Sequence, residues 1–257
     1  MARQVSAERP LSVVVLGNSL SVLSLPGRTG GEDGSYAEVL RDSLAKSGVP
    51  VNVHLAGRWF DFATSAVGRY ERDVRSHLPD VLIVQYGLNE LQPWLIPVPV
   101  IRHLMSNQTA KRPIGPWYRQ RLQKRIWKVV RAYRKAASGV VGMRTWQTTP
   151  NRFREAMHQI IRASRHDSRP LVLVLDIDQP GAALAHHLKR LPERHRVMQQ
   201  VLRDVVDGFD DPDIRLVEAS RIRDEAGDGA TADGMHYTPK GHRAIGEVLA
   251  TDILNWL

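Results

Sequence analysis

A hydroxyl, an imidazole and a carboxylate occur in this sequence where they could act together on an acyl group. Ser19 lies in Gly17-Asn18-Ser19-Leu20, directly after the apolar run Val13 to Leu16. Asp233 precedes His236 by three residues, a spacing at which one turn can hold a carboxylate near an imidazole. Nucleophilic acyl transfer needs a hydroxyl, a base that takes its proton and a group that orients the base. These three side chains therefore predict an acyl-transfer site.

Donors for a developing oxyanion follow the next two expected strands. Gly57 ends one strand and presents an unobstructed backbone N–H, and Asn89 follows the other with a side-chain amide. The backbone N–H of Ser19 is the third donor. Taken singly, Gly57 is explained as a strand breaker, Asn89 as a turn amide and Asp233 as a loop cap. Their occurrence together, each at a strand end or a helix start, favours a catalytic site.

The elements that must position these residues alternate between strand and helix, which is typical of a parallel sheet with crossover helices. Strands are expected over residues 13–16, 51–57, 80–87, 169–177 and 214–220. Helices are expected from a Ser35–Glu38 capping box, over about 61–77, over 151–164, and from Thr238-Pro239 to about 256. The carboxyl ends of parallel strands meet at one edge of a sheet, which is where ligands bind in such folds.

About 80 residues separate the third and fourth expected strands, many more than an ordinary connection needs. Residues 151–164 supply the crossover helix, so residues 91–148 are a basic, largely helical insertion at the edge where the site is expected. The segment from Leu91 to Arg154 contains 14 Lys or Arg and no Asp or Glu, whereas the rest of the chain holds 22 basic and 27 acidic residues. The basic charge of the protein is therefore local. The apolar residues 91–105 are expected to form a lid or an acyl-binding wall over Ser19.

Residues 116–137 have helical periodicity, with an apolar stripe beside a face of one charge sign. The stripe consists of Tyr118, Leu122, Ile126, Val129, Val130 and Tyr133. Like charges one turn apart destabilise a helix, so an anionic partner is expected. An acidic carrier protein and an anionic membrane surface both fit, and nucleic acid ranks last because no recognition motif accompanies the charge. The alternative is a helix packed on the core with a solvated charged face.

Other classes of site find little support. The chain has no cysteine, which excludes disulfides and thiolate metal sites. Its other histidines show no metal-ligand spacing, and we expect Asp176 and Asp178, after the fourth strand, to cap a helix or turn. We therefore expect no metal and no cofactor. No secretory signal or run of about 18 apolar residues occurs, so we expect a cytoplasmic protein.

Four motifs together resemble those of the SGNH/GDSL hydrolase (esterase/lipase) family. They are Gly17-Asn18-Ser19-Leu20, Gly57, Gly87-Leu88-Asn89 and Asp233-Gly234-Met235-His236. The resemblance covers most of the chain apart from the insertion. It implies that Ser19 is the nucleophile, His236 the base and Asp233 its orienting acid, with Ser19, Gly57 and Asn89 lining the oxyanion hole. It also implies one α/β domain over residues 1–257, a flavodoxin-like three-layer α/β/α sandwich around a five-stranded parallel sheet.

Two positions depart from the family pattern. Asn18 stands where the family usually has an Asp before the serine, and Glu90 where it usually has an Asp after the oxyanion asparagine. Neither position carries the reaction, so we expect a serine esterase that hydrolyses an acyl ester through a Ser19 acyl-enzyme. An acyltransferase or a thioesterase acting on a carrier-bound acyl group shares the first half-reaction and stays open. So does a non-catalytic binding module, if Asn18 and Glu90 have spoiled the site.

Overall fold

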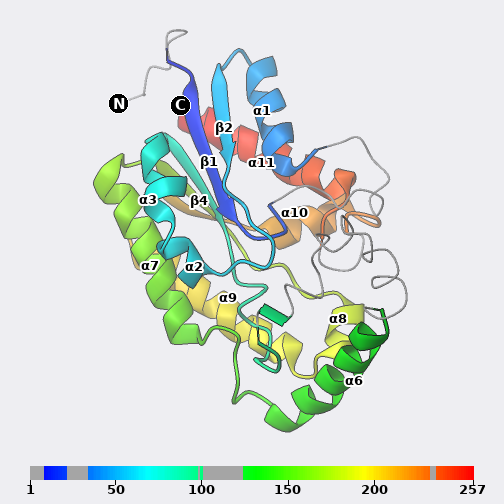
Figure 1. The fold of residues 1–257 in the computed structure, drawn as a ribbon. Coiled ribbons are helices and arrows are strands. Elements are labelled where there is room, and N and C mark those ends of the chain that lie inside the picture. The colour runs from blue at the N-terminus through cyan, green and yellow to red at the C-terminus, as the bar shows by residue number, and fades with distance from the viewer. Residues whose placement is uncertain (1–8, 22–33, 98, 101–123, 232–235) are drawn as a thin grey trace, which may run out of the picture.

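The computed structural model describes residues 9–21, 34–97, 99–100, 124–231 and 236–257. Its centre is one five-stranded parallel sheet with the strand order β2-β1-β3-β4-β5 (Figure 1). The strands are β1 (Leu11–Gly17), β2 (Val51–Leu55), β3 (Val81–Gln85), β4 (Leu171–Leu175) and β5 (Ile214–Val217). Each lies where a strand was expected, so the predicted α/β fold with a five-stranded parallel sheet is confirmed.

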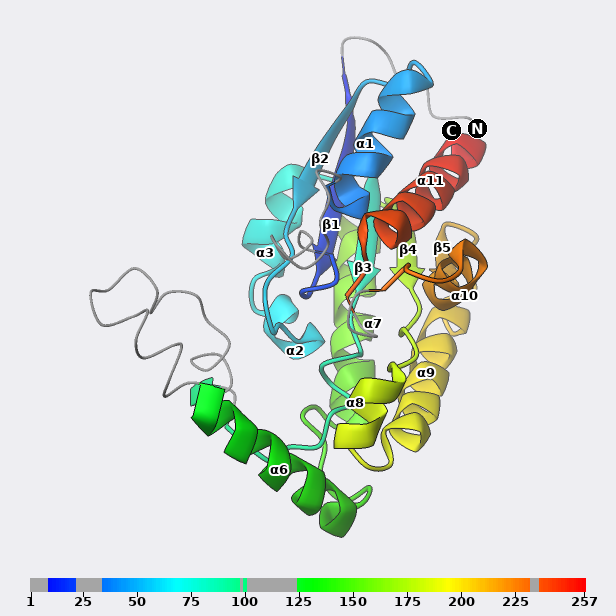
Figure 2. The same ribbon diagram turned by 90° about the vertical axis from the view of Figure 1, so that its right-hand side faces the viewer.

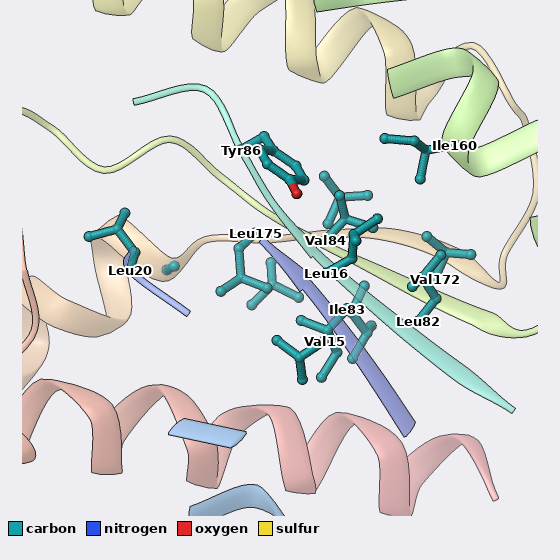
Figure 3. Packing of buried hydrophobic residues seen from close by; sticks show 14 of the residues in the cluster. Val15, Leu16, Leu20, Leu82, Ile83, Val84, Tyr86, Ile160, Val172 and Leu175 are labelled. Carbon is teal, nitrogen blue, oxygen red and sulfur yellow. The ribbon is translucent and has the colours of Figure 1, made fainter. Parts of the chain in front are cut away.

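Helices cover both faces of the sheet. The long ones are α1 (Tyr36–Lys46), α7 (Pro150–Asp167), α9 (Leu191–Asp207) and α11 (Pro239–Trp256). In Figure 3, α11 lies on one side of the central strands and α7 and α9 lie on the other, and α1 packs against α11. The shorter elements are α2 (Ala63–Val67), α3 (Tyr70–Asp73), the 3-10 helix η1 (Arg75–His77), α8 (Ala182–His187) and α10 (Ala219–Ala226). None of the described helices is long and apolar enough to cross a membrane.

The core lies on both sides of the three inner strands. Val15 and Leu16 of β1 and Ile83 and Val84 of β3 are fully buried, and Figure 3 shows their side chains packed between the helical layers. Strands covered on both faces are continuously apolar rather than alternating, which explains why these runs were recognisable in the sequence. The rigid sheet ends at one edge in polar loops, and these loops carry the candidate site.

The N-terminus of α11 forms as predicted. Thr238 caps the helix, with its hydroxyl oxygen accepting a hydrogen bond from the Gly241 N–H at 3.4 Å, and Pro239 occupies the first turn. This cap fixes where the chain enters α11, directly after the candidate base His236.

Ser35 is the N-cap of α1 as predicted, but the hydrogen bond expected from its side chain does not form. The Ser35 side chain is buried and its hydroxyl makes no hydrogen bond to a described residue. Instead, the Nδ1 atom of His242, within α11, accepts from the Tyr36 N–H at 3.1 Å. Burial, with a smaller contribution from nearby His236, lowers the pKa of His242 to about 4, which keeps its imidazole neutral and able to accept. A side chain from the opposite end of the chain thus replaces the local cap.

The single helix expected over about 61–77 is broken into α2, α3 and η1. Gly68 follows α2, and Arg69 has non-helical backbone angles (φ −117°, ψ 3°). The Arg69 side chain is buried, where it pairs with Asp61 and Asp73. The chain leaves the helical path at the residue whose charged side chain forms these internal ion pairs.

The connection between β3 and β4 contains α6 (Lys124–Val141) and then α7, which includes the crossover helix expected over 151–164. Residues 98 and 101–105 of the expected lid, and residues 116–123 of the helix expected over 116–137, lie outside the described residues. The expected apolar stripe does not pack as one face. Ile126 and Val130 are half-buried, whereas Val129 and Tyr133 are exposed.

Candidate active site

Ser19 and His236 are 217 residues apart in sequence, and they meet at the carboxyl edge of the sheet. The Nε2 atom of His236 lies 3.1 Å from the Oγ atom of Ser19. Ser19 follows the end of β1, and His236 lies two residues before the cap of α11. Both residues are partly exposed, so a substrate can reach them. A base at hydrogen-bonding distance from a hydroxyl can take its proton as the oxygen attacks.

The loop that carries His236 is closed at its base. Thr231 and Tyr237 form an isolated antiparallel bridge, and the Thr238 N–H donates to the carbonyl oxygen of Ala230 at 2.9 Å. Asp233 lies within residues 232–235, outside the described residues, so its role as the orienting acid stays a prediction. The bridge fixes Tyr237, the residue directly after His236.

The turn after β1 is held by its own side chains. The Asn18 side-chain oxygen accepts from the Leu20 N–H at 3.0 Å, and the Ser21 hydroxyl donates to the Asn18 carbonyl oxygen at 2.8 Å. A Cβ atom on Gly17 would lie 2.5 Å from the Ser21 Oγ and 3.2 Å from the Gln85 carbonyl oxygen. Glycine at position 17 therefore permits the tight turn that presents Ser19.

Asn89 lies in a turn that a buried carboxylate organises. The two oxygens of Glu90 accept from the Ala63 N–H at 2.7 Å and from the Gly87 N–H at 2.9 Å. One Asn89 side-chain N–H donates to the Asp61 carbonyl oxygen at 3.0 Å, which orients the amide and leaves its second N–H for another acceptor. Glu90 thereby ties the turn after β3 to the start of α2.

The backbone donors are positioned by a continuation of the sheet. Beyond the end of β2 the chain still bonds to β1. The Ala56 N–H donates to the Val15 carbonyl oxygen at 2.8 Å, and the Arg58 N–H donates to the Gly17 carbonyl oxygen at 3.1 Å. The N–H groups of Gly57 and Ser19 donate to none of the described residues. Both N–H groups are thus available for an oxyanion.

A buried ionic cluster, formed by Asp61, Arg69, Asp73 and Tyr86, lies beneath these donors. Arg69 forms ion pairs with both carboxylates and donates to the Tyr86 hydroxyl oxygen at 2.8 Å. Its side chain is only 6% exposed, and burying charges is tolerated when they are paired and hydrogen-bonded in this way. Burial raises the pKa of Tyr86, so its hydroxyl stays protonated and able to donate.

The buried ionic cluster contacts the backbone next to each candidate oxyanion donor. Arg69 donates to the Ala56 carbonyl oxygen at 2.8 Å, immediately before Gly57. The single proton of the Tyr86 hydroxyl is shared between the Asp61 carboxylate at 2.9 Å and the Gly17 carbonyl oxygen at 3.2 Å, two residues before Ser19. Asp61 completes the set, because its own carbonyl oxygen holds Asn89. One cluster therefore joins the loops that follow β1, β2 and β3.

A second buried network supports the loop of His236 from the opposite side. The Tyr237 hydroxyl donates to Asp178 and accepts from the Gln85 side-chain amide at 3.1 Å. Arg223 donates to the same Asp178 carboxylate at 2.8 Å. Burial raises the pKa of Asp178 to about 7, although Tyr237 and Arg223 both favour its ionised form. Because Tyr237 directly follows His236, this network anchors the base.

The expectation that Asp176 caps a helix is confirmed, since it accepts from the Ser220 N–H at 2.9 Å in the first turn of α10. The same expectation for Asp178 is wrong, because its carboxylate instead pairs with Arg223 and accepts from the Tyr237 hydroxyl. Within the described part of the chain, no group of three or more His, Asp or Glu side chains could hold a metal ion.

An aromatic side chain borders the site. The Trp59 ring centroid lies 6.3 Å from that of His236, and the residue is 44% exposed. An exposed indole beside the candidate base forms an apolar wall for whatever group binds there. Trp59 was not among the predicted site residues, although its position two residues after Gly57 could have indicated it. The buried ionic cluster was not predicted either, and no spacing pattern in the sequence indicates it.

The chain matches the profile of the GDSL-like lipase/acylhydrolase family over residues 13–249. It belongs to this family. Among solved structures, the GDSL protein is similar to the lipase/acylhydrolase from Enterococcus faecalis, with a TM-score of 0.61 and 14% sequence identity over 95% of this chain and 96% of that chain. A search of curated proteins finds no match.

Two further solved structures share the fold of this GDSL protein. The psychrotrophic esterase EstA from Pseudoalteromonas sp. has a TM-score of 0.57 and 12% identity, covering 95% of this chain and 97% of that chain. The acetylxylan esterase Axe2 from Geobacillus stearothermophilus has a TM-score of 0.55 and 13% identity, covering 96% and 93%. At such identities the likeness establishes the fold.

The two departures from the GDSL pattern have structural roles. The Asn18 amide oxygen accepts from the Leu20 N–H and stabilises the turn that carries Ser19, a function that needs an oxygen but no charge. The longer side chain of Glu90 reaches both Ala63 and Gly87. In both loops the side-chain oxygens at the departing position accept hydrogen bonds from the backbone and stabilise the turn.

Proposed function

We propose that this GDSL-family protein is a serine esterase that hydrolyses an acyl ester through an acyl-enzyme on Ser19. The observation that carries the proposal is the 3.1 Å separation of His236 Nε2 and Ser19 Oγ at the carboxyl edge of the sheet. His236 takes the hydroxyl proton as Ser19 Oγ attacks the ester carbonyl carbon. The same imidazole then gives this proton to the leaving alkoxide, so an alcohol departs and the acyl group stays on Ser19.

The oxyanion hole of the proposal consists of the Ser19 and Gly57 N–H groups and the second Asn89 side-chain N–H. Donors that are fixed before the reaction stabilise the developing negative charge without reorganising during it. The buried ionic cluster supports this assignment because it restrains the backbone beside each of the three donors. In the proposal Asp233 holds the other nitrogen of His236 and stabilises the imidazolium.

In the second half-reaction, His236 takes a proton from water, which attacks the acyl carbonyl and releases a carboxylic acid and free Ser19. Both the Pseudoalteromonas and the Geobacillus neighbours are described as esterases, which supports an oxygen ester as the substrate. An alcohol or amine in place of water would give acyl transfer from the same intermediate, and a thioester would enter by the same first step.

Steady-state hydrolysis of chromogenic short-chain and long-chain esters tests the proposal. Ser19→Ala and His236→Ala should each lower kcat by roughly a thousandfold or more, as loss of a nucleophile or its base does. Ser47→Ala, at the exposed end of α1, is the matched control and should retain the wild-type rate. A wild-type rate equal to that of Ser19→Ala would instead identify a non-catalytic binding module.

Product analysis separates hydrolysis from transfer. With an added alcohol acceptor, a hydrolase yields mainly the free acid, whereas an acyltransferase yields mainly the new ester. A parallel assay with an acyl thioester compares kcat/KM for the two leaving groups. Preference for the thioester by wild type, lost in Ser19→Ala, would replace the esterase assignment with a thioesterase at the same site.

A further inference from the structure

The outward side of α6 is both apolar and basic. Three apolar residues project into solvent there: Val129 is 69% exposed, Tyr133 53% and Val140 85%. With 3.6 residues per turn these three share one side of the helix, and exposed basic residues line its edge. We call this set the α6 outer face; it consists of Val129, Tyr133 and Val140 with Arg125 and Lys128 along one edge.

The opposite side of α6 is fixed to the protein. Arg134 donates to the Gln92 side-chain oxygen at 2.7 Å, and the Lys189 N–H donates to the Ser138 hydroxyl at 3.1 Å. Lys135 Nζ lies 2.6 Å from His186 Nε2 of α8. These contacts set the rotation of the helix. Figure 2 shows α6 at the periphery, standing away from the helical layers that cover the sheet.

The charges of the α6 outer face are unbalanced. Arg125 and Lys128 are three residues apart, a spacing at which side chains are neighbours and like charges repel. They form no ion pair with the described residues, and the whole stretch from Leu91 to Arg154 contains no Asp or Glu. An anionic partner would relieve this repulsion, whereas the chain itself offers no counter-charge nearby in sequence.

We infer that the α6 outer face docks on an anionic lipid surface. A helix of 18 residues is about 27 Å long, and at the periphery its length is accessible to a planar surface. Apolar side chains along the centre and cations along the edge are the arrangement by which a helix lies in a bilayer interface. The lipid surface is favoured over an acidic protein because three projecting apolar side chains enter a bilayer without a complementary pocket.

The expected strength follows from the two cations. Each basic residue near an anionic bilayer improves binding by about fivefold, so two contribute roughly 25-fold, and the apolar residues add to this. Salt should weaken the attraction because the cations are exposed and screened. Docking does not require Ser19. The further statement, that docking brings the enzyme to its ester substrate, rests on the proposed function.

Vesicle co-sedimentation tests the inference. The wild-type protein should bind phosphatidylcholine–phosphatidylglycerol vesicles and not vesicles of phosphatidylcholine alone. Changing Arg125 and Lys128 to Glu should lower the affinity by roughly 25-fold or more. Val129→Ser with Val140→Ser, which leaves the charge unaltered, should weaken binding while keeping its dependence on salt. Circular dichroism and thermal unfolding check that each variant is folded.

The matched control reverses two exposed arginines on other helices. Arg162 lies on α7 and Arg196 on α9, so changing both to Glu alters net charge by the same amount. This control should keep most of the vesicle binding, and Ser19→Ala should keep all of it even where ester hydrolysis is abolished. Equal losses in the α6 variant and the control would overturn the inference. So would a wild-type protein that ignores anionic vesicles but binds an acidic protein.

Discussion

Replacing Glu90 by Gln should change how the stability of the protein depends on pH. Glu90 is fully buried, and burial raises the pKa of its carboxyl from 4.5 to about 7, more than its two backbone hydrogen bonds lower it. Between these values the folded state holds a proton that the unfolded state has lost. The contribution of Glu90 to stability is therefore greatest below pH 4.5 and falls as pH rises towards 7.

The size of this effect follows from the displacement of the pKa. Each pKa unit corresponds to about 1.4 kcal/mol, so the loss approaches about 3 kcal/mol by pH 8. In the variant, the Gln side chain cannot ionise, and its NH2 group would face one of the two backbone N–H groups that now donate to Glu90. The N–H group left without an acceptor lowers the stability of the variant by about 1–3 kcal/mol at every pH.

Denaturant unfolding at pH 4.5, 6 and 8 measures the difference in free energy of unfolding between wild type and Glu90→Gln. The contributions of all other titrating groups cancel in this difference. We expect the stability advantage of wild type to shrink by about 2–3 kcal/mol between the lowest and highest pH. Glu155→Gln, at an exposed position of α7, is the matched control and should show a constant difference. An advantage of wild type that grows with pH would refute the reasoning, because it would mean that the folded protein favours ionised Glu90.

Three other substitutions probe the site. Asn89→Ala should lower kcat for ester hydrolysis on the order of a hundredfold, as loss of one oxyanion donor does, and an unchanged rate would remove Asn89 from the oxyanion hole. Tyr86→Phe removes the hydroxyl 3.2 Å from the Gly17 carbonyl oxygen and should lower kcat with little change in KM; a lower Tm with full kcat would assign Tyr86 to stability alone. Gly87→Ala should destabilise the protein by roughly 1–3 kcal/mol in denaturant unfolding, because φ is +121° there and the new Cβ would overlap Ile177. Wild-type stability in this variant would contradict the backbone argument.

The parts of the fold that sequence predicted are those encoded locally. The strands are continuous apolar runs because both faces of the sheet are covered, and Thr238-Pro239 caps α11 within a few residues of sequence. The Ser35 side-chain cap failed because His242, distant in sequence, satisfies the same helix start. The local sequence there predicts a side-chain cap from Ser35, and a tertiary hydrogen bond from Tyr36 to His242 takes its place.

In the candidate site, too, the residues that could be predicted are those that lie in local sequence motifs. Ser19 and His236 were found because each lies in a short motif at an element boundary, and the structure brings them together. The buried ionic cluster was missed because an arginine is rarely buried, and nothing around Arg69 indicates that its charge is paired internally. The apolar stripe of α6 was also misjudged, since periodicity shows which residues share a side but not which side faces the protein.

Covalent labelling tests the central claim most directly. The Pseudoalteromonas neighbour was solved inhibited by monoethylphosphonate, and a phosphonate probe is attacked by an activated serine in the way an ester is. Intact-mass spectrometry of wild type and Ser19→Ala, each treated with a fluorophosphonate, should show one adduct on the wild type and none on the variant. A folded wild-type protein without an adduct, or an adduct that persists in Ser19→Ala, would contradict the assignment of Ser19 as the nucleophile.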